Sequence, residues 1–282
     1  MSGELAYPAH LPDSVGHTFI ITKYELLNYF RTRRFYILLA IGVVISGILT
    51  ALVGYYRPHA LLATPLTFYS SWWGGAINFV TILAGIFFGG DAISGEFQNK
   101  TGYFVVGHPI RRVSIYAGKW IAALIAAVIV YFVYTGIAVA NGLYYFGATI
   151  PWQLYEAIGL GLLYLIAVLA FTFLFSSLFK SSAMSILVTA ILLLFGFSLI
   201  ETLIATFTGI EPWFIITYGG GIVSNSLMDP FPAHVQDVPL GPRAGSLVVY
   251  TASVPEGIVI LLAYFVVCAI LGLLLFEMKE FT

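Results

Sequence analysis

Residues 91–119 read DAISGEFQNKTGYFVVGHPIRRVSIYAGK and form a charged segment between two long apolar runs. The flanking runs, residues 58–90 and 120–155, contain no Asp, Glu, Lys or Arg. Only 9% of the whole chain is charged, against roughly 25% in a soluble domain. The contrast predicts a membrane protein in which a polar loop joins two spans and is bound by a partner on that side of the membrane.

The composition supports the same conclusion. The chain has 282 residues, of which 60% are hydrophobic, and its mean hydropathy is +0.96. The single cysteine, Cys268, lies inside an apolar run, which excludes a disulfide within the chain and a cysteine metal cluster. We see no internal repeat, so one membrane domain is expected.

Six stretches without charged residues are long enough for a helix to cross the membrane, which takes about 20 apolar residues. Lipid cannot satisfy an open strand edge, so the spans are expected to be helices. The polar residues 64–71 delay the second helix, and Gly147 and Pro151 end the third. The predicted spans are 35–56, 70–90, 120–146, 155–178, 183–206 and 256–276.

The basic residues predict the orientation, because Lys and Arg concentrate on the cytoplasmic side. One side would carry only Arg57 and Arg243. The other would carry Lys23, Arg31, Arg33, Arg34, Lys100, Arg111, Arg112, Lys119, Lys180 and Lys279. We therefore expect a multi-pass protein of the cell membrane with both termini and residues 91–119 in the cytoplasm.

Three segments outside the spans have distinct patterns. Residues 1–17 predict a polar tail and no cleavable signal peptide, and residues 18–34 predict an amphipathic helix at the membrane surface. A helix exposed to the cytoplasm is the alternative for 18–34. Within the outer region 207–254, the apolar but glycine-broken residues 212–228 favour short re-entrant or interfacial helices, and the proline-rich residues 229–243 favour an exposed loop.

Several chemistries are not supported by the sequence. The nearest approach to a nucleotide-binding P-loop, at 102–109, lacks both the lysine and the hydroxyl that such a loop needs, so no ATP hydrolysis by the chain itself is expected. No two of the five histidines have the i,i+4 spacing of a zinc protease, and none lies in a span, so no metal ligand is predicted.

Glu201 follows Lys180 by a helical rise of about 31 Å. This places it at the outer interface, as an ordinary edge residue or as a gate. Gly85 and Gly89 in the second span would allow another helix to approach closely.

The order of these features resembles the permease subunits of type-2 ATP-binding-cassette (ABC) exporters. Residues 23–34, KYELLNYFRTRR, resemble the family's connecting helix, and 91–96, DAISGE, resemble its acidic motif after the second span. HPIRR at 108–112 followed by YAGK at 116–119 resembles the pattern that enters the third span. The broken stretch 212–228 lies where the family has re-entrant helices. Residues 100–102, KTG, depart from the family pattern.

The resemblance implies an all-α membrane protein with six transmembrane helices, an interfacial helix, cytoplasmic coupling helices and re-entrant outer helices. It implies coupling to two separate ATPase subunits, which would bind ATP and Mg²⁺, and pairing with a second permease subunit around a path lined by the first, second and fifth spans. No cofactor on this chain and no nucleic-acid partner are expected. The residues assigned to coupling are Asp91, Glu96, Lys100, Pro109, Arg111, Arg112 and Lys119, and those assigned to the interfacial helix are Lys23, Tyr24, Glu25, Arg31, Arg33 and Arg34.

Alternatives remain open from the residues alone. Arg111 and Arg112 would also be explained by the preference for basic residues on the cytoplasmic side. Ion pairs of Glu96, Arg111 and Arg112 would form either with the ATPase or within the loop. A secondary transporter would need charges in mid-span or paired broken helices, which are not evident, and a membrane anchor without a transport path is a further alternative.

Overall fold

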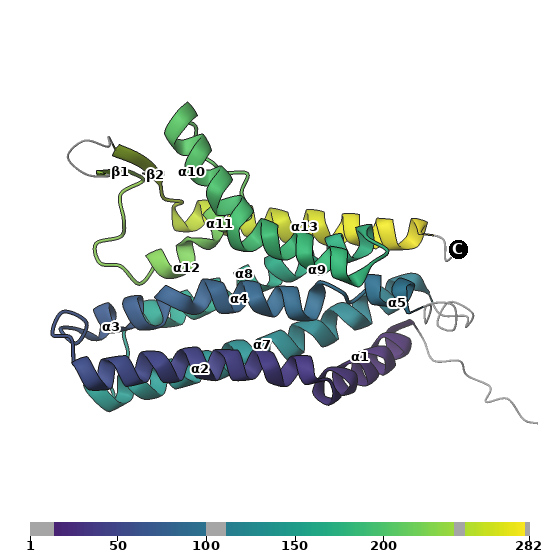
Figure 1. Cartoon of the computed structure of the whole chain (residues 1–282), viewed down its shortest axis with the longest axis horizontal. Helices are drawn as coiled ribbons and strands as arrows, with labels where there is room; N and C mark the ends of the chain where they lie inside the picture. Colours follow the sequence, from purple (N-terminus) through teal and green to yellow (C-terminus); the bar gives the residue numbers. More distant parts are fainter. Residues whose placement is uncertain (1–13, 100–110, 240–245, 280–282) are drawn as a thin grey trace, which may run out of the picture.

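The computed structural model describes residues 14–99, 111–239 and 246–279. Within these residues, six helical segments are long and apolar enough to cross a membrane, which confirms the predicted all-α membrane fold. They run side by side as a bundle (Figure 1). One end, called the basic end below, carries α1, α5 and the end of α13; the opposite end, called the outer end, carries α3 and a short β-hairpin.

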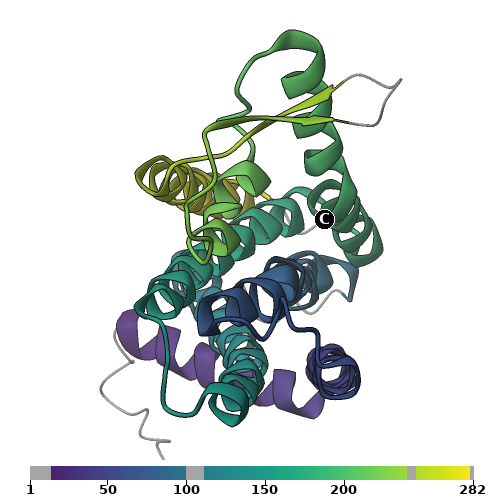
Figure 2. The same ribbon diagram turned by 90° about the vertical axis from the view of Figure 1, so that its left-hand side faces the viewer.

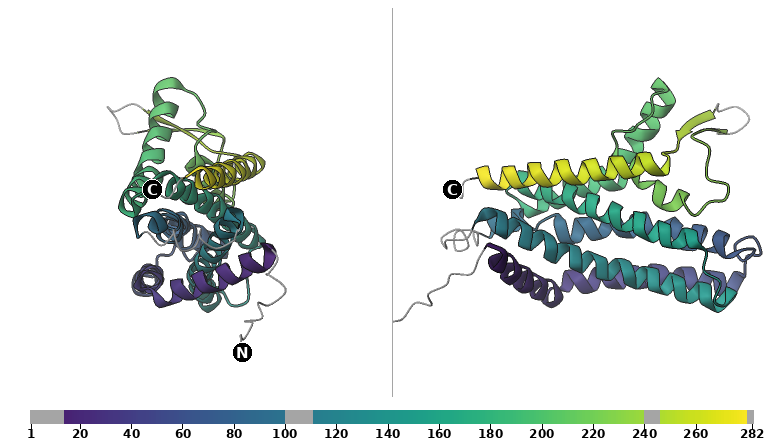
Figure 3. Two further views of the ribbon diagram at one scale, coloured as in Figure 1. Left: turned by 90° about the vertical axis from the view of Figure 1, so that its right-hand side faces the viewer. Right: turned by 180° about the vertical axis from the view of Figure 1, so that it is seen from behind.

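The first span is preceded by a separate helix. α1 (Ser14–Arg31) and α2 (Arg33–Tyr56) are divided at Thr32, whose backbone is extended and whose hydroxyl donates to the Tyr29 carbonyl at 2.8 Å. α1 lies obliquely across the end of the bundle, against α7 (Figure 3). The predicted helix at 18–34 therefore begins earlier and ends earlier than its expected bounds.

The second span begins before its predicted start at residue 70. α3 (Pro65–Trp72) and α4 (Gly74–Gly89) follow each other almost without interruption, and α5 (Ser94–Gln98) comes after a turn. The polar residues that argued for a later start instead cap the helix. Thr64 and Thr67 form a reciprocal capping box, and Pro65 takes the first helical position, where its missing N–H costs nothing.

The fourth span is, together with the second, the most buried of the six, and the third span packs against both. α7 (Arg112–Phe146) begins eight residues before the predicted span and runs for 35 residues, and α8 (Trp152–Leu178) follows after a short connection. Gly85 and Gly89 face α8: a Cβ at Gly85 would lie 2.5 Å from Val168, and one at Gly89 would overlap Thr172. The glycine pair thus allows α4 and α8 to pack closely, as predicted.

The fifth span is the least covered by its own chain. α9 (Ser182–Ile191), a π-helical turn (Leu192–Gly196) and α10 (Phe197–Thr208) are continuous, and α10 tilts away from the other helices (Figures 1 and 2). Only 17% of its apolar window is buried, against 61% for the second span. A π-helical turn inserts a residue into the helical ladder, which accounts for the change of direction.

The outer region is partly as predicted. Residues 212–228 form the short helices α11 (Ile216–Gly220) and α12 (Ile222–Asn225), which pack on α13 and α8. The interpretation of 229–243 as a loop is wrong for its later part. β1 (Val235–Pro239) pairs antiparallel with β2 (Ser246–Tyr250), with Val235 opposite Tyr250. The last span, α13 (Val254–Met278), leaves the hairpin and returns to the basic end.

Candidate functional site

Lys119 is the centre of a polar cluster at the basic end. Its ammonium donates hydrogen bonds to carboxylates on two other elements, Glu25 of α1 and Glu96 of α5, the latter at 2.7 Å. The Lys119 side chain is 7% exposed, and its partners are about one-fifth exposed, at 22% and 20%. A single buried cation therefore joins the connecting helix, the loop after the second span and the start of the third span.

Tight packing brings α1 and α7 together beside this cluster. Gly118 faces α1, and a Cβ there would lie 2.8 Å from Ile21, so a side chain would force the helices apart. The buried hydroxyl of Thr22 donates to the Gly118 carbonyl at 3.2 Å. The backbone approach at Gly118 is thus what allows the next residue, Lys119, to reach α1.

Two further contacts connect the first two helices to the end of the second span. Arg34, at the start of α2, forms an ion pair with Asp91 in the turn after α4. The Tyr29 hydroxyl of α1 donates to the Phe88 carbonyl at 2.8 Å. Arg34 is half exposed, so its ion pair contributes little stability, but it lies on the same surface as the buried cluster.

Helix α5 is anchored to the bundle by buried hydroxyl groups. The backbone N–H groups of Ile93 and Ser94 both donate to Ser176 Oγ of α8, at 2.9 and 3.0 Å. These are donors that a helix N-terminus leaves without an intrahelical partner. At the other end of α5, the Gln98 side chain accepts from the Ser182 N–H at 2.7 Å, so α5 also contacts the fifth span.

An open pocket of about 520 Å³ lies among these elements. Its wall includes both members of the Arg34–Asp91 pair and all three members of the Lys119 cluster. Such a mixture of exposed and half-buried charges is suited to contact with a polar protein surface. Within the Lys119 cluster itself, both carboxylates share one ammonium as their partner.

The two predicted arginines have different surroundings. Arg112 Nη1 donates to the carbonyls of Phe276, Glu277 and Lys279, at 3.3, 2.6 and 3.0 Å, and so caps the end of α13. Arg111 is exposed at the N-cap position of α7. Lys100 and Pro109 lie outside the described residues.

The residues assigned to the interfacial helix divide between two faces. Glu25 faces the protein, in the cluster above, while Lys23, Tyr24 and Arg31 of α1 are exposed. Arg33 and Arg34 are exposed too, but they belong to the first turn of α2 and not to the interfacial helix. The apolar side chains Phe19, Ile20 and Leu27 are exposed too. This face has the composition of a helix that lies on a membrane surface.

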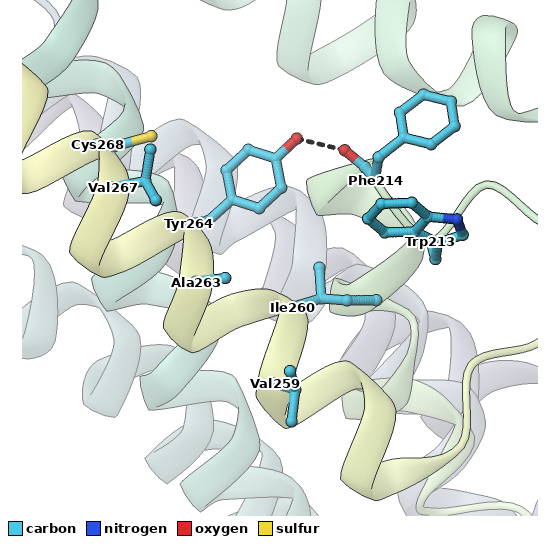
Figure 4. A pocket seen from close by; sticks show the side chains of 8 residues that line it. All are labelled: Trp213, Phe214, Val259, Ile260, Ala263, Tyr264, Val267 and Cys268. Carbon is cyan, nitrogen blue, oxygen red and sulfur yellow. Dashed lines mark hydrogen bonds between the residues drawn. The ribbon is translucent and has the colours of Figure 1, made fainter.

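At the outer end, Glu201 of α10 accepts a hydrogen bond from the Thr217 hydroxyl of α11 at 3.2 Å. An apolar groove of about 430 Å³ lies nearby between α13 and residues 213–214. Figure 4 shows its aromatic and aliphatic lining, with the Tyr264 hydroxyl donating to the Phe214 carbonyl at 2.6 Å. Residues far apart in the sequence form this groove, so no local pattern could have predicted it.

Comparison with known proteins identifies the class. The family model of the ABC-2 family transporter proteins matches residues 23–196, more than half of the chain and the part that contains the Lys119 cluster. The chain therefore belongs to the ABC-2 family of transporter proteins, and it is a membrane permease of an ABC transporter. A search among curated proteins gives no match. The family match favours the permease over the secondary transporter and the membrane anchor.

Proposed function

We propose that this chain is the permease subunit of an ATP-driven exporter and that residues 91–119 dock on a separate ATPase subunit. The observation that carries the proposal is the Lys119 cluster, which ties α5 to both α1 and α7. A movement imposed on α5 by a partner would reach the connecting helix and the third span without an intervening flexible segment. This is the arrangement that mechanical coupling requires.

The energy source would lie on the partner. Two ATPase subunits would bind ATP and Mg²⁺ and close on nucleotide binding, and the docked loops of two permease subunits would follow them. With this orientation the basic end, both termini and the exposed Arg111 are cytoplasmic, in agreement with the distribution of Lys and Arg. The membrane would be the cell membrane.

A second permease subunit, identical or different, would complete the path. The first and fifth spans leave much surface free to face it, with only 22% and 17% of their apolar windows buried within the chain, and the last span, at 22%, is equally uncovered. The second span is largely covered by its own chain but exposes Phe79 on α4. Since residues 35–56, 70–90 and 183–200 of these spans contain no charged side chain, the cargo would be hydrophobic or amphipathic.

Affinity purification of the full-length chain from mild-detergent extracts of its native membrane, followed by mass spectrometry, tests the docking. Arg111→Glu inverts an exposed charge in the docking segment without touching the buried cluster. Lys180→Glu is the matched control, because Lys180 is an exposed basic residue at the same end, on the connection between α8 and α9.

The proposal predicts that a P-loop ATPase is recovered with the wild type and with Lys180→Glu. Recovery of the ATPase should fall clearly with Arg111→Glu. Equal recovery with both variants would contradict docking at this segment. Absence of any ATPase from the wild-type preparation would contradict the coupling itself.

A further inference from the structure

Three potential metal ligands lie close together at the outer end, at the opposite end of the bundle from the Lys119 cluster. Glu211 lies in the connection between α10 and α11, His234 immediately precedes β1, and Glu256 is in the first turn of α13. One ligand atom from each lies within 4.8 Å of the other two. The residues are more than 20 positions apart in the sequence, which explains why spacing alone gave no sign of them.

The His234 ring is held in an orientation suited to a ligand. Its Nδ1 lies 3.0 Å from the Thr251 carbonyl oxygen, and the Thr251 N–H donates to the His234 carbonyl at 2.8 Å. A carbonyl oxygen only accepts, so Nδ1 carries the proton in this contact. In the neutral ring, Nε2 then has a lone pair directed towards Glu211, at 3.5 Å from its Oε2. Metal-binding histidines are commonly oriented by a carbonyl in this manner.

Both carboxylates are also held in place. The buried Tyr218 donates its hydroxyl to Glu211 Oε1, which leaves Oε2 towards His234. Glu256 Oε2 accepts from the Ser253 N–H at 3.2 Å, as the third residue of a capping box. In residues 14–99, 111–239 and 246–279, no lysine or arginine forms an ion pair with either carboxylate. Two facing carboxylates without a lysine or arginine partner repel each other unless a proton, a protonated histidine or a metal cation offsets their charge.

We propose that Glu211, His234 and Glu256 bind a divalent transition-metal ion such as Zn²⁺ at the outer face. Bonds of about 2.0–2.2 Å from a tetrahedral zinc place neighbouring ligand atoms roughly 3.3 Å apart. The His234–Glu211 distance of 3.5 Å is close to this value, and all the ligand atoms lie within 4.8 Å of one another, so small side-chain rotations would bring them to a common ion. One imidazole with two carboxylates suits zinc and its neighbours better than calcium, and a fourth position is left for water.

The ion would add a direct link among three segments of the outer end. The connection after α10, the hairpin and the start of α13 all leave the compact part of the bundle at this end (Figure 1). A bound cation would fix α10 relative to the last span. The proposal does not depend on ATPase coupling, since it concerns the opposite end of the molecule.

Zinc binding by the purified full-length protein in nanodiscs tests the site. After treatment with a chelator, zinc is titrated in competition with a chromophoric chelator, at fixed pH, for the wild type and for Glu211→Gln, His234→Ala and Glu256→Gln. Glutamine keeps the hydrogen bonds from Tyr218 and Ser253, so these variants remove charge with little effect on the local fold. His59→Ala is the control, because His59 is an exposed histidine in the α2–α3 connection at the same end.

We expect one zinc per wild-type chain, unchanged in the control, and binding weakened by at least about tenfold in each ligand variant. Tyr218→Phe, which removes only the orienting hydroxyl, is expected to weaken binding by roughly 10–100-fold. Absence of stoichiometric zinc in the wild type would show that His234 and Glu211 form only an ion pair. An equal loss in His59→Ala, or calcium binding unaffected by His234→Ala, would also overturn the proposal. Metal-free melting temperatures at or above that of the wild type would show that the glutamine variants are folded.

Discussion

Replacing Lys119 by methionine removes the ammonium from the Lys119 cluster while keeping the length and most of the volume of the side chain. It leaves Glu25 and Glu96 close together without the ammonium that joins them. Removal of one member of a fully buried ion pair costs about 3–5 kcal/mol. Because the two carboxylates remain 22% and 20% exposed, water can partly solvate them, and we expect a smaller loss of about 2–3 kcal/mol.

The charges predict a particular order among variants of this cluster. Glu25→Gln and Glu96→Gln each leave Lys119 with one carboxylate, so each is expected to cost no more than about 1 kcal/mol, the net value of one hydrogen bond. The triple variant Lys119→Met, Glu25→Gln, Glu96→Gln removes every charge. It should recover most of the stability lost in Lys119→Met, because uncharged replacements of buried ion pairs are often neutral.

Thermal unfolding in nanodiscs measures this order. A change of about 2–3 kcal/mol corresponds to a decrease in melting temperature of roughly 4–12 °C for a chain of this size. Lys119→Met should therefore melt well below either single glutamine variant, and the triple variant should melt above Lys119→Met. The reasoning fails if Lys119→Met melts with the wild type, or if the triple variant is no more stable than Lys119→Met.

Three other predictions concern separate contacts. Arg112→Ala should speed amide hydrogen exchange at the end of α13, because three carbonyls lose their donor; exchange as slow as in the wild type would contradict this role. Gly89→Leu should destabilise the protein by about 1–3 kcal/mol, because the new side chain overpacks against α8. Gly75→Leu is the control and should have little effect, because a Cβ at Gly75 meets nothing within 4 Å. Equal melting temperatures for the two variants would refute this prediction. Burial, and then the charge of Lys180, lower the pKa of Lys279 from 10.5 to about 8, so its labelling by an acylating reagent should rise with a midpoint near pH 8. The folded state then binds fewer protons than the unfolded state between these two values, and stability should increase with pH in that window; a labelling midpoint near 10.5 would contradict this environment.

The charge-free stretches were enough to predict the number and order of the spans, because a charge in the hydrocarbon region is costly at any position. They were less useful for the ends of helices. Residues 64–71 argued against a helix by polarity, yet Thr64 and Thr67 form a cap, and only the local Thr-Pro pattern could have indicated it. The strand β2 had a signal in residues 247–250, LVVY, that the adjacent prolines obscured.

The candidate site was predicted as a segment but not as a set of contacts. The loop 91–119 stood out because charge is rare in this chain, while the burial of Lys119 was not foreseen. Its position among Tyr116, Ala123 and Ala126, at helical spacing on the buried face of α7, is the signal that could have shown it. The pairing with Glu25, 94 positions earlier, depends on the path of the chain and is beyond any local pattern.

Photo-crosslinking from position 111 tests the central claim most directly. A photoreactive amino acid replaces Arg111 in the full-length protein, and native membranes are irradiated before any detergent is added. Position 57, exposed at the outer end, serves as the control. The account predicts a covalent product between position 111 and a P-loop ATPase, and none from position 57. Products from position 111 that contain no ATPase, in membranes where the transporter is intact, would contradict it.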